Sequence, residues 1–223
     1  MSQNWTPKQR VNTALTLGVP DRVPVVLNPI LHGPSMAGLS LSEFMQSPPA
    51  IAETMVTIHK MLGTDMLTAV PYVAVEVEAW GGQTLFHSNG PPVVGVLPFR
   101  NVETACKAPV PEVKESPSLV RVLETIKLMR GLVGAQVPIC GVVLSPFSLI
   151  AVQIGLADMF EAMQRSPDAF EQLLQANTGF CIEWANAQAL EGVDGIIVVD
   201  AVGSPMIASR AERSRWSATA LRR

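Results

Sequence analysis

The sequence has few cysteines and no long hydrophobic run, and each shortage excludes a class of protein. Its three cysteines, Cys106, Cys140 and Cys181, lie far apart, without the CxxC or His-x-Cys spacing of a redox or metal motif. No run of about 18 apolar residues could span a membrane, and the start MSQNWTPKQR lacks the apolar core of a signal peptide. We therefore expect a cytoplasmic protein with reduced, mostly buried thiols.

Nucleotide-binding motifs are also missing. No GxGxxG or GxxxxGK[ST] follows any predicted strand, which removes the usual signatures of a nucleotide-binding sheet. The composition is globular, 48% hydrophobic and 16% charged over 223 residues, which suffices for one substantial core. The net charge is −3, and residues 210–223 carry five arginines and Glu212, or +4, so the remainder carries −7. An acidic body argues against nucleic acid as a partner.

Short apolar strands alternate with amphipathic helices along the chain. Thr6 and Gln9 can form a capping box around Pro7, which fits the first position of a helix. Further helical periodicity covers 51–62, with Gly63 as its stop, then follows Ser116, covers about 157–164 and follows Ser166. Apolar runs predict four strands, at 23–27, 65–73, 138–144 and 196–199.

This alternation predicts an α/β fold with parallel strands and right-handed crossovers. An open doubly wound sheet and a (β/α)8 barrel are both compatible with it, and the missing nucleotide motifs favour the barrel. A TIM barrel needs about 250 residues and eight strand–helix units. Four strands therefore predict about the first half of such a barrel over residues 1–207. Residues 79–111, rich in glycine and proline, are expected to form an inserted loop or hairpin.

The end of the chain differs from the rest. Hydrophobic periodicity stops after Ile207, and the last 14 residues hold five of the eleven arginines. A basic arm for nucleic acid or a membrane is one interpretation. The tail lacks the length and composition usual for such an arm, so we expect residues 208–223 to be an aberrant, disordered tail.

Candidate site residues lie at the carboxyl ends of the predicted strands, because barrel sites form there. Asn28 and His32 follow the first strand, and His32 either binds a ligand or is simply solvated. Tyr72 ends the second strand and is expected to face the mouth of the barrel, with packing as the alternative.

Three carboxylates and a serine complete the candidates. Glu76 and Glu78 share a face if VAVEVEAW is extended, where they could bind a ligand or supply oxygen to a metal, although a solvated edge or salt bridge is slightly favoured. Ser145 offers a hydroxyl in the turn SPF, which is often structural. Asp200 is the best single candidate, because a carboxylate directly after an apolar strand must be solvated or paired. Its alternative role is to cap the turn at Gly203.

Four blocks of the sequence resemble, in order, the uroporphyrinogen decarboxylase superfamily. They are TPKQRVNTALTLGVPDRVPVV, GTDMLTAVPYVAVEVEAWGG, GVVLSPFSLIAVQIG and EGVDGIIVVDAVGSPMI. The blocks with VEVEAWGG and VVDAVGSPMI are most similar to the methylcobamide:coenzyme M methyltransferase branch. The resemblance covers about residues 6–207 and implies a (β/α)8 barrel. Members of the family continue beyond the point where this chain ends, so we expect a C-terminally truncated barrel.

The decarboxylase residues of the family are not matched here. Its two substrate-binding arginines would fall at Pro29 and Gly33, its aspartate at Tyr72 and its tyrosine at Val152. Without a cationic clamp, a polycarboxylate would be left unpaired in a site of low dielectric, which is costly. The resemblance therefore disfavours porphyrinogen decarboxylation.

The methyltransferase branch implies a zinc ion, held by a His-x-Cys pair and a later cysteine, that keeps an acceptor thiol as the thiolate. The thiolate attacks a methyl group on a corrinoid. None of His32, His59 and His87 lies two residues before a cysteine, so zinc is expected in a full-length form but not in this chain, which is expected to be inactive alone. The implied partners are a corrinoid protein or free methylcobamide and a small thiol such as coenzyme M.

Two alternatives remain open. The first is a uroporphyrinogen decarboxylase or a related decarboxylase. The second is a non-catalytic barrel fragment that binds a partner or forms a homodimer through its open sheet edges, because unpaired edge strands invite pairing. Neither nucleic acid nor a membrane is expected as a partner.

Overall fold

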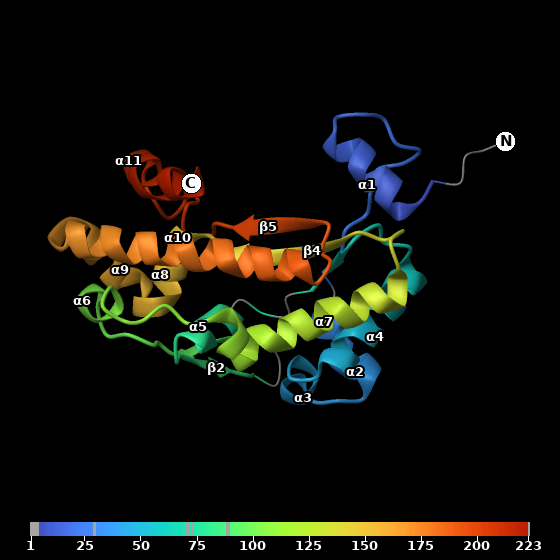
Figure 1. Cartoon of the computed structure of the whole chain (residues 1–223), viewed down its shortest axis with the longest axis horizontal. Helices are drawn as coiled ribbons and strands as arrows, with labels where there is room; N and C mark the ends of the chain where they lie inside the picture. Colours follow the sequence, from blue (N-terminus) through green and yellow to red (C-terminus); the bar gives the residue numbers. More distant parts are fainter. Residues whose placement is uncertain (1–4, 29, 70–71, 73, 88–89, 223) are drawn as a thin grey trace.

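A parallel sheet of three strands forms the centre of the described structure, in the order β1–β4–β5 (Figure 1). β1 is Leu67–Thr68, β4 is Ile139–Leu144 and β5 is Gly195–Val199. The computed structural model describes residues 5–28, 30–69, 72, 74–87 and 90–222. The register pairs Leu67 with Ile139 and runs from Cys140 opposite Gly195 to Leu144 opposite Val199. Parallel pairing is confirmed.

The first predicted strand is much shorter than expected. Only one bridge, between Val26 and Met66, joins the segment 23–27 to the sheet, beside β1. The reason is that side chains take up its backbone groups. The Val25 amide donates to the Asp65 carboxylate at 2.8 Å, and an Arg22 guanidinium donates to the Val23 carbonyl. Of the second predicted strand, residues 70, 71 and 73 lie outside the described residues.

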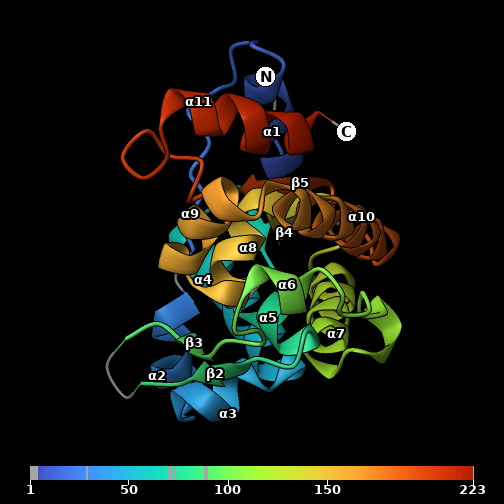
Figure 2. The ribbon, with the colours of Figure 1, turned by 90° about the vertical axis from the view of Figure 1, so that its left-hand side faces the viewer.

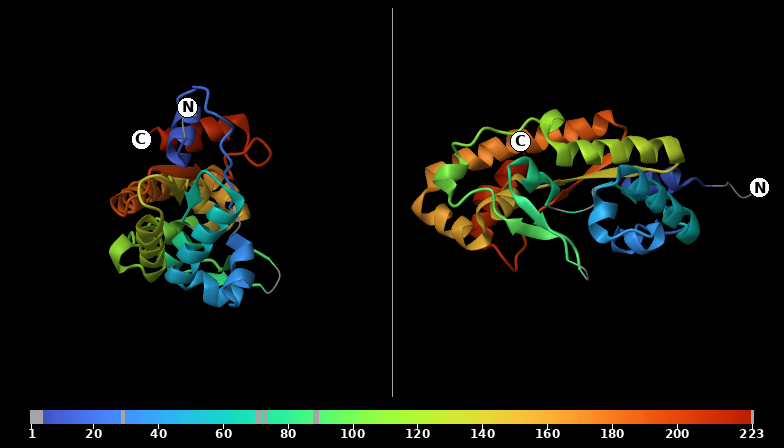
Figure 3. Two further views of the ribbon diagram at one scale, coloured as in Figure 1. Left: turned by 90° about the vertical axis from the view of Figure 1, so that its right-hand side faces the viewer. Right: turned by 90° about the horizontal axis from the view of Figure 1, so that it is seen from below.

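Long helices cover one side of the sheet. α10 (Pro167–Leu190) packs on β4 and β5, and α7 (Pro117–Val133) packs on β4 and on α4 (Pro48–Leu62). Figures 2 and 3 show α10 and α7 side by side along this layer. The main core lies between the helices and the sheet and includes the fully buried Trp184 and Phe180. The other helices are α1 (Pro7–Leu15), η1 (Ile30–His32), α2 (Gly33–Ala37), α3 (Leu41–Met45), α5 (Val75–Ala79), α6 (Val102–Ala105), η2 (Val113–Glu115), α8 (Pro146–Ile154) and α9 (Leu156–Arg165).

Capping residues place several helices where the sequence predicts them. The capping box at the start of α1 is present, with the Gln9 amide donating to Thr6 Oγ1 and the Thr6 amide donating to the Gln9 side chain. α4 ends at Gly63, whose φ of 62° is the left-handed conformation that glycine adopts without strain. The segment 79–111 contains an antiparallel hairpin of β2 (Gln83–Leu85) and β3 (Val93–Val96).

The C-terminal tail differs from our expectation of disorder. It forms α11 (Arg210–Glu212), a π-helical turn η3 (Arg213–Ser217) and α12 (Ala218–Leu221). Trp216 is buried against Phe170, with ring centroids 4.9 Å apart in an edge-to-face arrangement. Trp216, together with Ala208 and Ala220, packs this segment on the second core cluster around Phe147, and so few apolar residues create no visible hydrophobic period.

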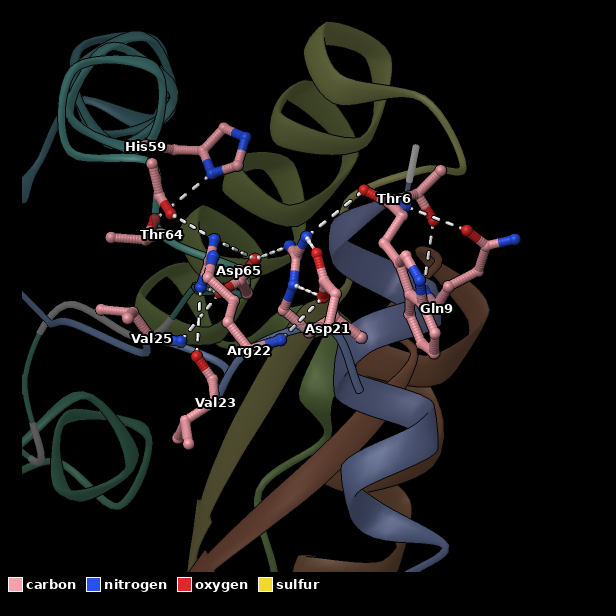
Figure 4. Close-up of polar contacts among 12 residues, drawn as sticks. Thr6, Gln9, Asp21, Arg22, Val23, Val25, His59, Thr64 and Asp65 are labelled. Atoms are coloured by element: carbon pink, nitrogen blue, oxygen red, sulfur yellow. Dashed lines mark hydrogen bonds and ion pairs between the residues drawn. The ribbon is translucent and has the colours of Figure 1, made fainter. Parts of the chain in front are cut away.

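A buried carboxylate fixes the amino-terminal segment (Figure 4). Asp65, with a side chain only 1% exposed, accepts hydrogen bonds from Arg10 and Arg22 at 2.5 Å each. Arg10 also forms a two-bond pair with Asp21. This network, here called the Asp65 clasp, ties α1 and the segment 23–27 to the amino end of β1.

None of the helices in the described part of the chain is by itself long and apolar enough to cross a membrane. Only α8 and α9 together reach the length and hydropathy of a span, and they are bent by 111° relative to each other.

Candidate functional site

Ser145 and Asp200 meet at the carboxyl edge of the sheet. Ser145 directly follows β4, and Asp200 directly follows β5, so the parallel register brings them together. The Ser145 hydroxyl donates to Asp200 Oδ1 at 2.5 Å and accepts the amide of Ser148 at 2.9 Å, which makes it the N-cap of α8. The sequence prediction that both lie at the carboxyl ends of strands is consistent with this arrangement.

Two further hydroxyl groups complete the shell around Asp200. Ser148 donates to Oδ1 at 2.8 Å, and Ser217 of the C-terminal helices donates to Oδ2. Burial acts to raise the pKa of Asp200, but the hydrogen bonds from Ser145, Ser217 and Ser148 and from the Gly203 amide outweigh it and hold the pKa below its usual range. Asp200 is therefore an ionised, fully bonded carboxylate, and it also caps the turn at Gly203.

Glu76 lies beneath the same edge. The condition under which Glu76 and Glu78 would share a face is not met, because residues 75–79 form the short helix α5 rather than an extended segment. Both carboxylate oxygens of Glu76 lie within hydrogen-bond distance of the Leu144 amide, at 3.0 and 3.3 Å, and the side chain is buried. Burial raises the pKa of Glu76 to about 8, against the opposing effect of the Leu144 amide, so this carboxyl group is protonated at neutral pH.

Glu78 belongs to a separate cluster. Two residues apart on a helix, Glu76 and Glu78 do not share a face, and Glu78 instead forms a salt bridge with Arg121 at 2.9 Å. Its carboxylate also accepts hydrogen bonds from the hydroxyls of Tyr72 and Thr84. Tyr72 is buried, and burial together with the Glu78 charge raises its pKa to about 12. The packing and salt-bridge alternatives given for Tyr72 and Glu78 describe these contacts.

Asn28 and His32 line a cavity of about 420 Å³ between the end of the first strand segment, α2 and α4. Its other walls are apolar, and His32 itself is exposed. The cavity lining consists of Leu27, Asn28, His32, Met36, Ile58, Met61 and Leu62.

The residues that the structure describes do not fit a catalytic metal. Within the described ranges, no three or more His, Cys, Asp or Glu side chains gather closely enough to hold a metal ion. His59 bonds Thr64 through Nδ1 at 3.2 Å, and His87 lies on the rim of another cavity, near the hairpin.

The seven predicted candidates thus fall into three places rather than one. In the first place Ser145 and Asp200 meet, and Glu76 accepts a hydrogen bond from the amide of Leu144, the residue before Ser145. The second place is the Tyr72–Glu78 cluster, and the third is the cavity lined by Asn28 and His32. Sequence reasoning missed Ser148, Ser217 and Arg121. Ser145 is the N-cap of α8 and Ser148 is its third residue, so this spacing could have indicated that Ser148 lies beside Ser145. No local pattern in the sequence points to Ser217 or Arg121.

Comparison with known proteins adds the family. The family model described as uroporphyrinogen decarboxylase (URO-D) matches residues 6–223. The chain belongs to this family. A methylcobamide:CoM methyltransferase of Methanosarcina barkeri is 28% identical over 211 residues, which cover 92% of this chain and 61% of that protein. A uroporphyrinogen decarboxylase of Geotalea uraniireducens is 27% identical over 177 residues, covering 77% of this chain and 51% of that protein.

The fold is also similar to that of a solved methyltransferase structure. A methyltransferase from Methanosarcina mazei superposes with a TM-score of 0.87 at 27% identity, covering 98% of this chain and 66% of the other. The chain therefore has the α/β fold of the family. It spans about half to two thirds of the length of these relatives.

Proposed function

We propose that this chain belongs to a corrinoid-dependent methyltransferase, which moves a methyl group between a methylcobamide and a thiol such as coenzyme M. The observation that carries the proposal is the chemistry of the positions where decarboxylases bind their acidic substrate. At Gly33, an added Cβ would lie 2.3 Å from the Phe44 ring, so an arginine has no room there. Pro29, the other matching position, lies outside the described residues.

The two remaining decarboxylase positions are also unsuited to that role. Tyr72 is committed to Glu78 and Arg121 through its hydroxyl, and Val152 packs against the core. The carboxyl edge instead carries an ionised Asp200, with the protonated Glu76 buried beneath it. A uroporphyrinogen carries several carboxylates, which Asp200 would repel at high cost in a site of low dielectric, because its bonding partners are hydroxyls and an amide rather than a cation.

The periphery of a corrin suits this edge better. Its side chains end in neutral amides, whose N–H groups are donors for a carboxylate and for serine hydroxyls. We place the corrin edge at Ser145 and Asp200, because these groups lie at the carboxyl ends of adjacent strands, where α/β folds bind ligands. The broader coverage of the methyltransferase relatives, 92% against 77% of this chain, supports the same choice.

The zinc ion implied by the resemblance would activate the acceptor thiol. Because the described residues offer no set of donors for the zinc ion, their role is to bind and orient the methyl donor. The zinc donors are proposed to lie in the part of the relatives' length that this chain does not span.

Equilibrium dialysis with methylcobalamin tests the proposal, alongside an assay of uroporphyrinogen decarboxylation. We expect the chain to retain methylcobalamin, Asp200→Asn to retain it at least tenfold less tightly, and no decarboxylated product to form. Asp158→Asn, which changes an exposed carboxylate on α9, is the matched control and should bind like the unchanged chain. Turnover of uroporphyrinogen, or failure to retain methylcobalamin, would overturn the assignment.

A further inference from the structure

Side chains bond the backbone near the carboxyl end of β4. Among the described residues, β1 pairs with β4 only as far as Cys140. Beyond that point, the side-chain amide of Gln188 accepts a hydrogen bond from the Val142 amide and donates to the Val142 carbonyl, at 3.1 Å each. Gln188 can approach because residue 141 is glycine, where an added Cβ would lie 2.4 Å from Gln188 Oε1. In this part of the sheet, a side chain does for Val142 what a strand would otherwise do.

Leu144 is bonded in the same way, by side chains from two different helices. Its amide donates to the carboxyl oxygens of Glu76, on α5, at 3.0 and 3.3 Å, and its carbonyl accepts a hydrogen bond from the Cys181 thiol, on α10, at 3.3 Å. The next residue is Ser145, whose hydroxyl donates to Asp200. The position of that hydroxyl therefore depends on how firmly Glu76 and Cys181 hold the peptide groups of Leu144.

The surroundings of Glu76 favour its neutral form. Its side chain is buried, and burial raises its pKa to about 8, because a charge is costly away from water. Of the titratable groups packed around it, Cys181 is a thiol, Arg121 is paired with Glu78 at 2.9 Å, and Asp200 is bonded by serine hydroxyls. α8, β2 and the carboxyl half of β4 contain no titratable residue. No cation in the described part of the chain thus offsets the burial of Glu76.

A buried donor beside Glu76 is unused. The Trp184 indole is fully buried, and its Nε1 has no hydrogen-bond partner among the described residues. The indole lies near enough to the carboxyl group to act against burial and lower the pKa of Glu76. A carboxylate accepts more and stronger hydrogen bonds than a neutral carboxyl group, so ionised Glu76 gains by turning to this donor. An unpaired buried N–H group is itself costly, which adds to the same preference.

We propose that Glu76 is a positioning residue for the Ser145–Asp200 pair. While neutral, it holds the Leu144 amide; when it ionises, its proton leaves to solvent and its carboxylate turns to the Trp184 indole. The peptide before Ser145 is then released on one side and holds the hydroxyl less firmly on Asp200. The proposal concerns this geometry and not the identity of a ligand, so it and the proposed function can fail separately.

Hydrogen exchange followed by NMR on the full 223-residue chain tests the proposal. At pH 9, about one unit above the pKa of Glu76, about nine-tenths of the chains carry the ionised group. We expect the protection factor of the Leu144 amide to fall by about tenfold or more between pH 7 and pH 9. The Ser148 amide, which donates to Ser145 Oγ at 2.9 Å, should lose protection with it, because it reports the position of that hydroxyl. The Val143 amide, in the ladder with β5, should keep its protection.

Two carboxylate variants separate ionisation of Glu76 from a general effect of high pH. Glu76→Gln keeps an acceptor oxygen for the Leu144 amide but cannot ionise, so the loss of protection at pH 9 should disappear. Glu183→Gln changes an exposed carboxylate on α10, next to Trp184 in the sequence. It is the matched control and should lose protection at Leu144 like the unchanged chain.

The indole N–H signal of Trp184 gives a measurement on the unchanged chain. We expect this signal to move downfield with a midpoint at about pH 8, as the indole N–H gains an acceptor. Trp184→Phe removes the donor, so Leu144 should then lose protection only at higher pH. An indole signal that stays in place, equal protection of Leu144 at pH 7 and pH 9, equal losses at Leu144 and Val143, or a loss that persists in Glu76→Gln would each refute the proposal.

Discussion

At the scale of single residues, the protonation state of Glu76 at neutral pH depends on the fold. Its side chain is buried, and its pKa is raised to about 8 from an ordinary 4.5 by burial. Between these two pH values the folded chain holds a proton that the unfolded chain has lost. The contribution of Glu76 to the free energy of unfolding is therefore fully present below about pH 4.5. It decreases as the pH rises and is completely lost once the pH has passed 8.

The first prediction follows from this sign. Between about pH 5 and 8, the free energy of unfolding should fall by up to about 1.4 kcal/mol per pH unit. Glu76→Gln should remove this slope, because glutamine keeps an acceptor oxygen but has no proton to lose. Urea denaturation at several pH values measures it. Glu161→Gln, at an exposed residue of α9, should leave the slope unchanged. A slope that persists in Glu76→Gln would contradict the buried, neutral state of this carboxyl group.

Asp65 gives the second prediction. Replacing it with asparagine leaves the Arg10 guanidinium, itself 9% exposed, with only Asp21 as its ionic partner, and breaks both arginine pairs of the Asp65 clasp. We expect Asp65→Asn to lower the free energy of unfolding by about 3 kcal/mol, whereas Glu53→Gln on the exposed side of α4 should change it little. Chemical denaturation of the three proteins at one pH gives the comparison. Equal stabilities would show that the clasp does not hold α1.

At the scale of secondary-structure elements, the start of α1 and the end of α4 could be predicted, because a capping box and a left-handed glycine are local signals. α5 could not. Val75, Glu76 and Val77 are all buried, so the alternation of polar and apolar residues in VEVEA carried no information about which face meets solvent. The pairing of Ser145 with Asp200 was half predictable: each follows a strand, but only the register of β4 and β5 brings them together.

The C-terminal helices give the third prediction, at the scale of an element. Trp216 is their main buried anchor on Phe170, so Trp216→Ala should release residues 209–221 while the sheet keeps its fold. Hydrogen exchange should then become much faster for the amides of η3 and α12, with those of β4 unchanged. Leu221→Ala, at a 48% exposed position of the same segment, serves as the comparison and should exchange like the unchanged chain. Unaltered protection in Trp216→Ala would show that other contacts hold this segment.

At the scale of the whole molecule, the order of the motif blocks was enough to predict the family, because each block marks one strand and its exit. The pairing of strands was not predictable in the same way. It depends on contacts between segments that lie far apart in the sequence, and the segment 23–27 lost most of its ladder to the side chains of Asp65 and Arg22. Periodicity reports how a segment is buried, not which segment lies beside it.

Because Ser217 donates a hydrogen bond to Asp200, the C-terminal helices compete with any ligand for this carboxylate. Any molecule that needs Oδ2 of that carboxylate must first displace a hydroxyl that is tethered to it through only 16 intervening residues, at an effective concentration in about the millimolar range. The apparent dissociation constant of that molecule is then its intrinsic constant divided by the fraction of time that the Ser217 hydroxyl is away from Oδ2, so binding is weakened. Occupancy of the site and ordering of the carboxyl terminus are thus opposed.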